Sequence, residues 1–196
     1  MNPNLRPLAY VSPYAWIYWA VFVLVYFPEF RLIARTKPEP GKTDRSMNLI
    51  LLLGWLGFPL AFALAGWRMF ILARGQKAWF WLGIAFLLLG STLRQHCFRM
   101  LGKFFTANVK VASGQTVVQE GAYRWVRHPS YTGGMMMYLG TGLGLTNWLS
   151  ALVITVLGAI GYAYRVHVEE QTLQASLGQP YCDYMSRTKR FVPFLF

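Results

Sequence analysis

Apolar residues fill five long runs of the chain that carry no charged side chain. Roughly 20 consecutive apolar residues let an α-helix cross the hydrocarbon core of a bilayer. The pattern therefore predicts an all-α fold, a multi-pass integral membrane helical bundle with about five transmembrane helices. The third run is short, and we expect its helix to continue past Arg94. The runs span residues 8–27, 47–67, 78–93, 131–145 and 148–164.

Only residues 146–147 join the last two runs. A connection this short allows nothing but an antiparallel helical hairpin. The hairpin returns the chain close to where it entered, so His128 at one foot and residues 165–170 at the other should be neighbours in space. We expect the first helix to begin at Pro129 or Ser130, because proline suits the first helical position and disfavours a helical residue before it.

The run 140–144, GTGLG, looks like a glycine-rich nucleotide-binding loop. It lies inside an apolar run, however, and no strand precedes it, as such a loop would require. We therefore interpret it as a set of small residues that lets helices pack closely.

The longest polar stretch, residues 94–130, is expected to form a short cytosolic segment that lies on the bundle. Within it, residues 108–118 alternate in polarity like a short extended hairpin, with Ser113 and Gly114 as the candidate turn. Beyond the last apolar run we expect a C-terminal helix.

Composition separates the chain from soluble domains, since it is 55% hydrophobic and only 13% charged. The net charge of +12 could indicate a nucleic-acid partner, but the basic residues stand between apolar runs rather than on one soluble patch. We expect membrane lipid with anionic head groups as a partner, and no nucleic acid. Cys97 and Cys182 form no metal pair, and no metal is expected.

The basic residues also predict the orientation in the membrane. Fifteen of the 19 Lys and Arg lie in residues 28–46, 94–130 and the tail after residue 164, and four lie in the alternate segments. Cytoplasmic connections carry the excess of Lys and Arg. We therefore expect the N-terminus outside, the C-terminus in the cytosol, and any site at the hairpin feet on the cytosolic face.

The first foot combines basic residues with a helix start. The exposed N–H groups of a helix that begins at Pro129 would lie beside Arg127 and His128 and form an anion-binding corner. The alternative is that Arg124 and Arg127 are anchors at the level of the lipid head groups, with Tyr131 as an interfacial aromatic residue.

The second foot carries adjacent acids. Arg165 and Glu169 are four residues apart, on one face of a helix, whereas Glu169 and Glu170 point about 100° apart and cannot both enter one pocket. The chain has only seven acidic residues, and ionisable groups where a span emerges are functional candidates. The alternative is a helix ion pair beside a solvated acid.

Two stretches resemble a known family. VVQEGAYRWVRHPSYTG at 117–133 and EEQTLQASLGQPYCDYM at 169–185, separated by the hairpin, are similar to the isoprenylcysteine carboxyl methyltransferase (ICMT) family and its prokaryotic relatives. The resemblance implies a single membrane domain, 1–196, that uses S-adenosyl-L-methionine. The apolar runs predict three transmembrane helices in residues 1–100, and the resemblance, which covers residues 101–196, implies that these form the catalytic half.

By position, the resemblance also assigns roles. It implies that Arg165 faces the carboxylate of the substrate. Three positions depart from the family pattern, since Gln115 stands where the family often has His, Ala122 replaces a Pro and Leu177 replaces a Phe. The residues implied to bind the cofactor are Val117, Val118, Tyr123, His128, Pro129, Ser130, Tyr131 and Glu169.

The implied reaction is O-methylation of an isoprenylcysteine-type carboxylate on a lipophilic or prenylated substrate. An ionised carboxylate needs no general base, so residues that bind and orient are sufficient. Other readings stay open: methylation of a thiol or a phospholipid amine, an NADPH-dependent membrane sterol or steroid reductase with a similar hairpin, and a non-catalytic membrane subunit. Arg165 favours an anionic acceptor, because it would repel a protonated amine.

Overall fold

The computed structural model describes residues 5–35, 45–105, 109, 111 and 114–192 of the chain. Within these residues the fold is helical and no β-strand occurs, which confirms the all-α class. The α-helices are α1 (Tyr14–Arg35), α2 (Arg45–Ala65), α3 (Gln76–Leu101), α4 (Pro129–Gly144), α5 (Trp148–Leu177) and α6 (Gln179–Arg187). The 3₁₀ turns are η1 (Leu8–Tyr10), η2 (Arg68–Phe70), η3 (Gly102–Phe104) and η4 (Gly121–Arg124).

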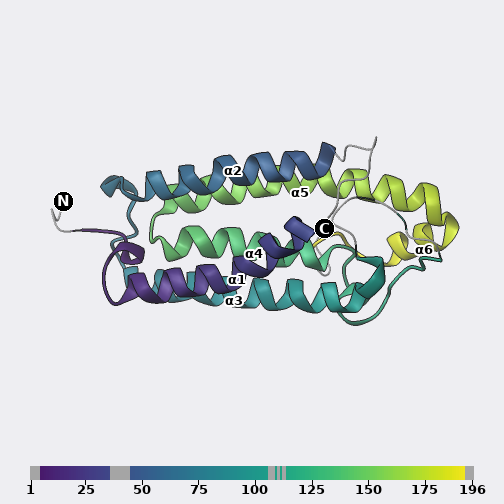
Figure 1. Ribbon diagram of the computed structural model, residues 1–196, viewed down its shortest axis with the longest axis horizontal. Helices are drawn as coiled ribbons and strands as arrows, with labels where there is room; N and C mark the ends of the chain where they lie inside the picture. The colour runs from purple at the N-terminus through teal and green to yellow at the C-terminus, as the bar shows by residue number, and fades with distance from the viewer. Residues whose placement is uncertain (1–4, 36–44, 106–108, 110, 112–113, 193–196) are drawn as a thin grey trace.

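The five long helices run along one axis of the molecule, and α6 lies at one end of it (Figure 1). α3 and α5 pack against α4, α2 packs against α5, and α1 packs against α3. α1 and α2 meet through aromatic side chains, with the ring of Phe22 5.8 Å from Phe58 and that of Trp19 5.2 Å from Phe62. α4 is the enclosed helix of the bundle, and ten of its 16 residues are buried.

Local sequence explains where the hairpin helices begin and end. α4 begins at Pro129, as predicted, with His128 outside the helix at φ −125°. Asn147 caps α5, because its side chain accepts a hydrogen bond of 3.0 Å from the Ser150 N–H. Gly178 ends α5 at φ 61°, which a glycine adopts readily, and α6 begins at the next residue.

The helices differ from the apolar runs at several places, and the start of α1 and the end of α3 are two of them. The first apolar run was predicted to be helical from residue 8, but α1 begins only at Tyr14. Pro13 accounts for the delay, because a proline disfavours the helical conformation of the residue before it, here Ser12. α3 continues past Arg94, as expected.

The predicted extended hairpin is only partly covered by the structure. Ser113, half of its candidate turn, lies outside the described residues. Residues 114–118 are described and form no strand, so that part of the prediction is wrong. The reason is that Val117 and Val118 face a cavity in the helical bundle rather than a partner strand.

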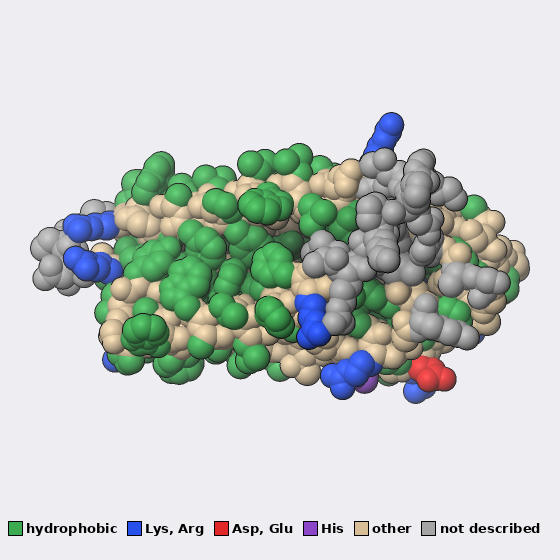
Figure 2. Space-filling view, viewed as in Figure 1, with side chains coloured by type: hydrophobic (Ala, Val, Ile, Leu, Met, Phe, Trp, Pro, Cys, Tyr) green, Lys and Arg blue, Asp and Glu red, His purple; other side chains and the backbone are tan. Residues whose placement is uncertain are grey.

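The outer surface is suited to lipid. Figure 2 shows apolar side chains over the left and middle parts of one face, with Lys and Arg at the left end and at several places in the right half. Large apolar side chains point outward, and Trp16 and Trp55 are 77% and 79% exposed. Among the described residues, α1, α2 and α5 contain stretches long and apolar enough to cross a membrane. The number of crossings stays a prediction.

Glycines bring the helices around α4 into close contact. A Cβ atom added at Gly83 of α3 would overlap the backbone nitrogen of Gly144 in α4. On the other side of α4, a Cβ atom at Gly142 would overlap the Cα atom of Ala151 in α5. The GTGLG run therefore serves close helix packing, as its position in an apolar run indicated.

Gly83→Ala should destabilise the bundle by about 1–3 kcal/mol, because the added methyl group forces α3 away from α4. The measurement is the midpoint of thermal unfolding of the detergent-solubilised protein. Gly54→Ala in α2 is the matched control, since a Cβ atom there meets nothing within 4 Å. An equal midpoint for both variants would contradict the role of Gly83 in packing.

Candidate functional site

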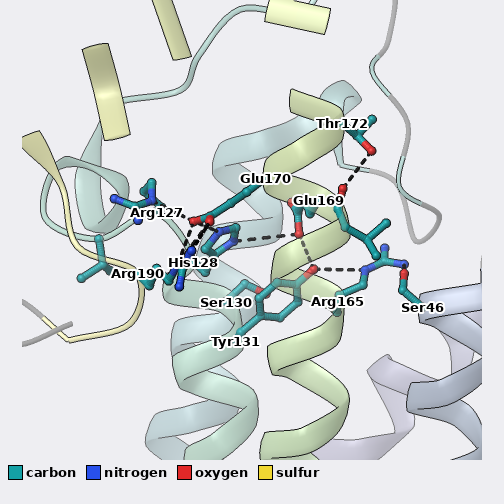
Figure 3. A network of polar contacts seen from close by, with 12 residues as sticks. Ser46, Arg127, His128, Ser130, Tyr131, Arg165, Glu169, Glu170, Thr172 and Arg190 are labelled. Atoms are coloured by element: carbon teal, nitrogen blue, oxygen red, sulfur yellow. Dashed lines mark hydrogen bonds and ion pairs between the residues drawn. The ribbon is translucent and has the colours of Figure 1, made fainter. Parts of the chain in front are cut away.

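The two feet of the α4–α5 hairpin meet at one end of the bundle. Tyr131, in the first turn of α4, donates a hydrogen bond of 2.6 Å from its hydroxyl to Oε2 of Glu169. His128, directly before α4, places Nε2 3.3 Å from Oε1 of Glu170. These pairs lie 38 and 42 residues apart in sequence, so the predicted proximity of the two feet is confirmed (Figure 3).

Glu170 is a buried carboxylate with two arginine partners besides His128. Oε1 accepts a hydrogen bond of 3.0 Å from Nε of Arg127, and Oε2 accepts one of 2.8 Å from Nη2 of Arg190. The side chains of Glu170 and Arg127 are only 5% and 9% exposed. The interpretation of Arg127 as a head-group anchor is therefore wrong, because its guanidinium compensates a buried carboxylate instead.

The segment after α6 is held against the start of α4. The backbone N–H groups of Arg127 and His128 donate hydrogen bonds of 2.7 and 2.9 Å to the carbonyl groups of residues 189–190. Thr132 donates from its hydroxyl to the carbonyl of Phe191 at 2.7 Å. The chain end that supplies Arg190 is thus fixed by backbone contacts as well as by the ion pair.

Two tyrosines tie α6 to η4 beneath the site. The hydroxyl of Tyr184 donates a hydrogen bond of 2.7 Å to the carbonyl of Tyr123. Burial raises the pKa of Tyr184 to about 12 and also raises the pKa of Tyr123. Both phenols therefore stay neutral at physiological pH and act only as hydrogen-bonding groups.

Arg165 links the hairpin to α2. Its Nε donates to the hydroxyl of Tyr131 at 3.3 Å, and its Nη1 donates to Oγ of Ser46 at 2.9 Å. Arg165 is 4% exposed, whereas the side chain of Glu169, one helical turn further along α5, is 30% exposed. Three helices therefore converge on one buried guanidinium, and an accessible carboxylate lies beside it.

A cavity of about 660 Å³ opens beside these groups. Pro129 does not line it, although it starts the helix that forms one wall. Glu169 lines the cavity and Glu170 does not. This agrees with the expectation that two adjacent helical side chains, which point about 100° apart, cannot both enter one pocket. Eight of the nine residues singled out from the sequence line it: Val117, Val118, Tyr123, His128, Ser130, Tyr131, Arg165 and Glu169.

The cavity has a polar part and an apolar slot. The part that we call polar holds Arg165 and Glu169 and extends along α5 past Thr172, where Leu173 and Leu177 add apolar side chains to its wall. The apolar slot, between α1 and α2, follows α2 in the other direction from Met47 to Phe62, a rise of about 22 Å. Arg165 lies where the two parts join. Lining side chains of the slot include Phe22, Tyr26, Ile50, Leu51, Trp55 and Phe58.

The sequence analysis missed an ion pair on the α1–α3 side of the cavity. Nε and Nη2 of Arg94 donate to the two carboxylate oxygens of Glu29 at 2.9 and 2.6 Å. Both residues line the cavity, and their side chains are 11% and 13% exposed. The sequence did contain a signal for this pair. The chain has few acidic residues, and Glu29 is one that follows an apolar run almost directly.

Fold and site together define the class of protein. It is an integral membrane protein of packed helices, with a cavity that joins ionisable groups at one end of the bundle to an apolar slot between helices. Within the described residues, no three His, Cys, Asp or Glu side chains are grouped to hold a metal ion.

Comparisons with known proteins point to one family. A family profile described as the isoprenylcysteine carboxyl methyltransferase (ICMT) family matches residues 81–175. The solved structure of a eukaryotic intramembrane Ras methyltransferase, ICMT, superposes with a TM-score of 0.65 and 27% identity, and covers 95% of this chain and 70% of that one. Over residues 81–175, slightly less than half of the chain, the sequence therefore matches the ICMT family.

Curated relatives agree with this assignment. A protein-S-isoprenylcysteine O-methyltransferase of Tribolium castaneum is 29% identical over 187 residues, which cover 91% of this chain and 65% of the relative. A protein-S-isoprenylcysteine O-methyltransferase B of Arabidopsis thaliana is 32% identical over 126 residues, which cover 62% of this chain and 64% of the relative. The chain thus spans slightly less than two thirds of the length of these relatives.

Glu170→Gln should lower the stability of the protein by about 3 kcal/mol, because it leaves the buried guanidinium of Arg127 without its carboxylate. The thermal unfolding midpoint should fall, and limited proteolysis should cut the segment after α6 faster. Asp183→Asn, at an exposed carboxylate of α6, is the control for the same chemical change. Unchanged proteolysis of Glu170→Gln would argue against the role of Glu170 in holding that segment.

Proposed function

We propose that the protein is an S-adenosyl-L-methionine-dependent methyltransferase that esterifies the carboxylate of an isoprenylcysteine-type substrate in the membrane. The observation that carries the proposal is the single cavity in which Arg165 separates a polar part from an apolar slot. A substrate with a carboxylate at the end of a long apolar tail matches that division. The O-methyltransferase names of the two relatives support the same reaction.

The polar part has groups that suit S-adenosyl-L-methionine. Glu169 offers a partly exposed carboxylate to the hydroxyl or amine groups of the cofactor. Val117 and Val118 offer an apolar wall for a flat ring, and the stacked rings of His128 and Tyr131, 5.5 Å apart, form another wall. When bound, the cofactor supplies a methyl group on a positively charged sulfur.

Arg165 determines the class of acceptor in this proposal. A buried guanidinium binds a carboxylate with charge-assisted hydrogen bonds and repels a protonated amine. The acceptor carboxylate is already ionised, so no side chain has to remove a proton from it. The residues of the chain have to orient the carboxylate and exclude water. The prenyl tail would lie in the apolar slot and enter from the lipid between α1 and α2.

The orientation in the membrane is part of the proposal. A soluble cofactor has to reach the polar part from an aqueous compartment, and the excess of Lys and Arg assigns that end of the bundle to the cytosol. The N-terminus would then lie outside and the C-terminus in the cytosol. Anionic lipid head groups would surround the basic residues at the cytosolic end.

Purified protein in detergent micelles should transfer a labelled methyl group from S-adenosyl-L-methionine to N-acetyl-S-farnesylcysteine and form a base-labile ester. The readout is volatile methanol released by alkali. The control acceptor is the same compound with a carboxamide in place of the carboxylate. It should receive no labelled methyl group. A prenyl thiol and phosphatidylethanolamine test the other acceptors, and transfer to either one in place of the acid would contradict the proposal.

Ligand binding tests the reductase alternative separately. S-adenosylhomocysteine should raise the thermal unfolding midpoint, because a ligand that binds only the folded state stabilises it. NADPH at the same concentration should leave the midpoint unchanged. The opposite result would favour the reductase, and no shift with either ligand would favour a non-catalytic membrane subunit.

Two substitutions should separate cofactor binding from acceptor binding. Glu169→Gln should weaken S-adenosylhomocysteine binding about tenfold, because a charged hydrogen-bond acceptor is lost. Arg165→Gln should leave that affinity close to wild type and lower kcat/KM for the prenylcysteine about a hundredfold, because the acceptor carboxylate loses its buried cation. Calorimetric titration and steady-state rates give the two values. Unaltered cofactor affinity in Glu169→Gln would refute its assigned role.

A further inference from the structure

The apolar slot ends in a cluster of aromatic rings that come from three helices. Its last lining residues are Phe22 on α1, Phe62 on α2 and Tyr138 on α4. Among the described residues of these helices, none further from the polar part lines the cavity. The rings of Phe22 and Phe62 lie 5.6 Å apart, so α1 and α2 close the slot at this level. A tail whose carboxylate lies in the polar part therefore meets a wall of rings.

Phe58 is the first ring of this wall. It lines the cavity one helical turn before Phe62 along α2 and therefore lies nearer to the polar part. The centroid of its ring lies 5.1 Å from that of Tyr26, 5.8 Å from that of Phe22 and 5.8 Å from that of Tyr138. A single ring thus bridges the slot from α2 to both α1 and α4.

A buried hydrogen bond holds Tyr26, the nearest partner of Phe58. The hydroxyl of Thr141 donates to the carbonyl of Met137 at 2.9 Å, and a hydroxyl has only one proton to donate. The hydroxyl of Tyr26 therefore donates to Oγ1 of Thr141, at 3.0 Å. Tyr26 is 6% exposed and Thr141 is fully buried. Tyr26 thus cannot swing aside for a longer tail without breaking a buried hydrogen bond.

The length of the slot before Phe58 suits one class of prenyl tail. Along α2 the slot is lined from Met47, and Phe58 follows after a rise of about 16 Å. An extended chain advances about 1.2 Å per bond, so one isoprene unit adds about 5 Å and a farnesyl chain spans about 15 Å. A geranylgeranyl chain, one unit longer, needs about 20 Å. The longer chain therefore reaches Phe58 before its last unit is inside the slot.

We propose that Phe58 limits the prenyl tail to the length of a farnesyl chain, so that the protein selects farnesyl over geranylgeranyl substrates. The inference rests on the proposed function and adds a specificity-determining residue on the acceptor side of the cavity. The selection acts through the tail, whichever side chains bind the carboxylate. A longer tail either leaves its last unit outside the slot or moves the carboxylate out of line with the methyl group, which lowers the rate.

The experiment measures kcat/KM of the full chain for N-acetyl-S-farnesylcysteine and its geranylgeranyl analogue. Both are supplied at equal mole fraction in the micelle, so that their unequal partition from water does not enter. Wild type should favour the farnesyl compound about tenfold, and Phe58→Ala, which removes a ring about as large as one isoprene unit, should abolish that preference. A loss of packing alone would lower both values by the same factor and leave their ratio unchanged.

Two further variants complete the test. Phe58→Trp extends the ring into the slot and should shift the preference about tenfold from the farnesyl compound towards the geranyl compound, which is one unit shorter. Phe70→Ala is the matched control, because it removes the same ring from η2. There Phe70 packs 5.0 Å from Trp148 and does not line the cavity, so the ratios should stay at the wild-type values.

Three outcomes would overturn the inference. The first is a wild type that uses the farnesyl and geranylgeranyl compounds equally well. The second is an unchanged ratio in Phe58→Ala, because the tail would then leave the slot before it reaches Phe58. If Phe58→Ala does not fold, an unchanged ratio of geranyl to farnesyl activity in Phe58→Trp is the third. If neither variant folds, the preference of wild type decides alone.

Failure of the proposed function is distinguished by the activity of wild type. If wild type transfers no methyl group to either compound, the proposed function fails, and the inference is then judged by binding. Calorimetric titration should show tighter binding of the farnesyl compound than of the geranylgeranyl compound in wild type, and equal binding in Phe58→Ala. Equal affinities in wild type, or no binding of either compound, would refute the inference independently of activity.

Discussion

The architecture of the site depends on the compensation of one buried carboxylate. Glu170 is removed from water, and a buried charge is tolerated only with opposite charges and hydrogen bonds around it. Its partners are Arg127 and His128, directly before α4, and Arg190, in the segment after α6. The cluster therefore aligns the start of α4 with α5 and with the chain end. Once Glu170 is fixed, the helix turns Glu169 into the cavity.

Acidic residues are few in this chain, and three of them act inside the bundle. Glu170 fixes the fold of the site, Glu169 faces the cavity, and Glu29 pairs with Arg94 on the far side. Each is compensated by a donor from a different helix or segment, which is how a mostly apolar protein can hold charge. Arg165 lies at the junction of the polar and apolar parts of the cavity.

Close helix packing makes the cavity asymmetric. Glycines bring α3 and α5 against α4, whereas bulky aromatic rings of α1 and α2 meet each other. The space between α1 and α2 is thus lined by apolar side chains and faces the part of the surface that is suited to lipid. In the proposed reaction, a lipid-anchored substrate and a soluble cofactor would approach Arg165 from opposite parts of one cavity.

The sequence by itself determined the helical membrane class, the hairpin of α4 and α5, the helix start at Pro129 and eight residues of the cavity wall. These follow from apolar run lengths, a two-residue connection, proline geometry and a family motif, all of which are local in sequence. The tertiary structure decided that Arg127 is buried, that Arg190 reaches Glu170 and that Glu29 neutralises Arg94. Partners that are 20 to 65 residues apart depend on how helices pack, and no local pattern encodes that.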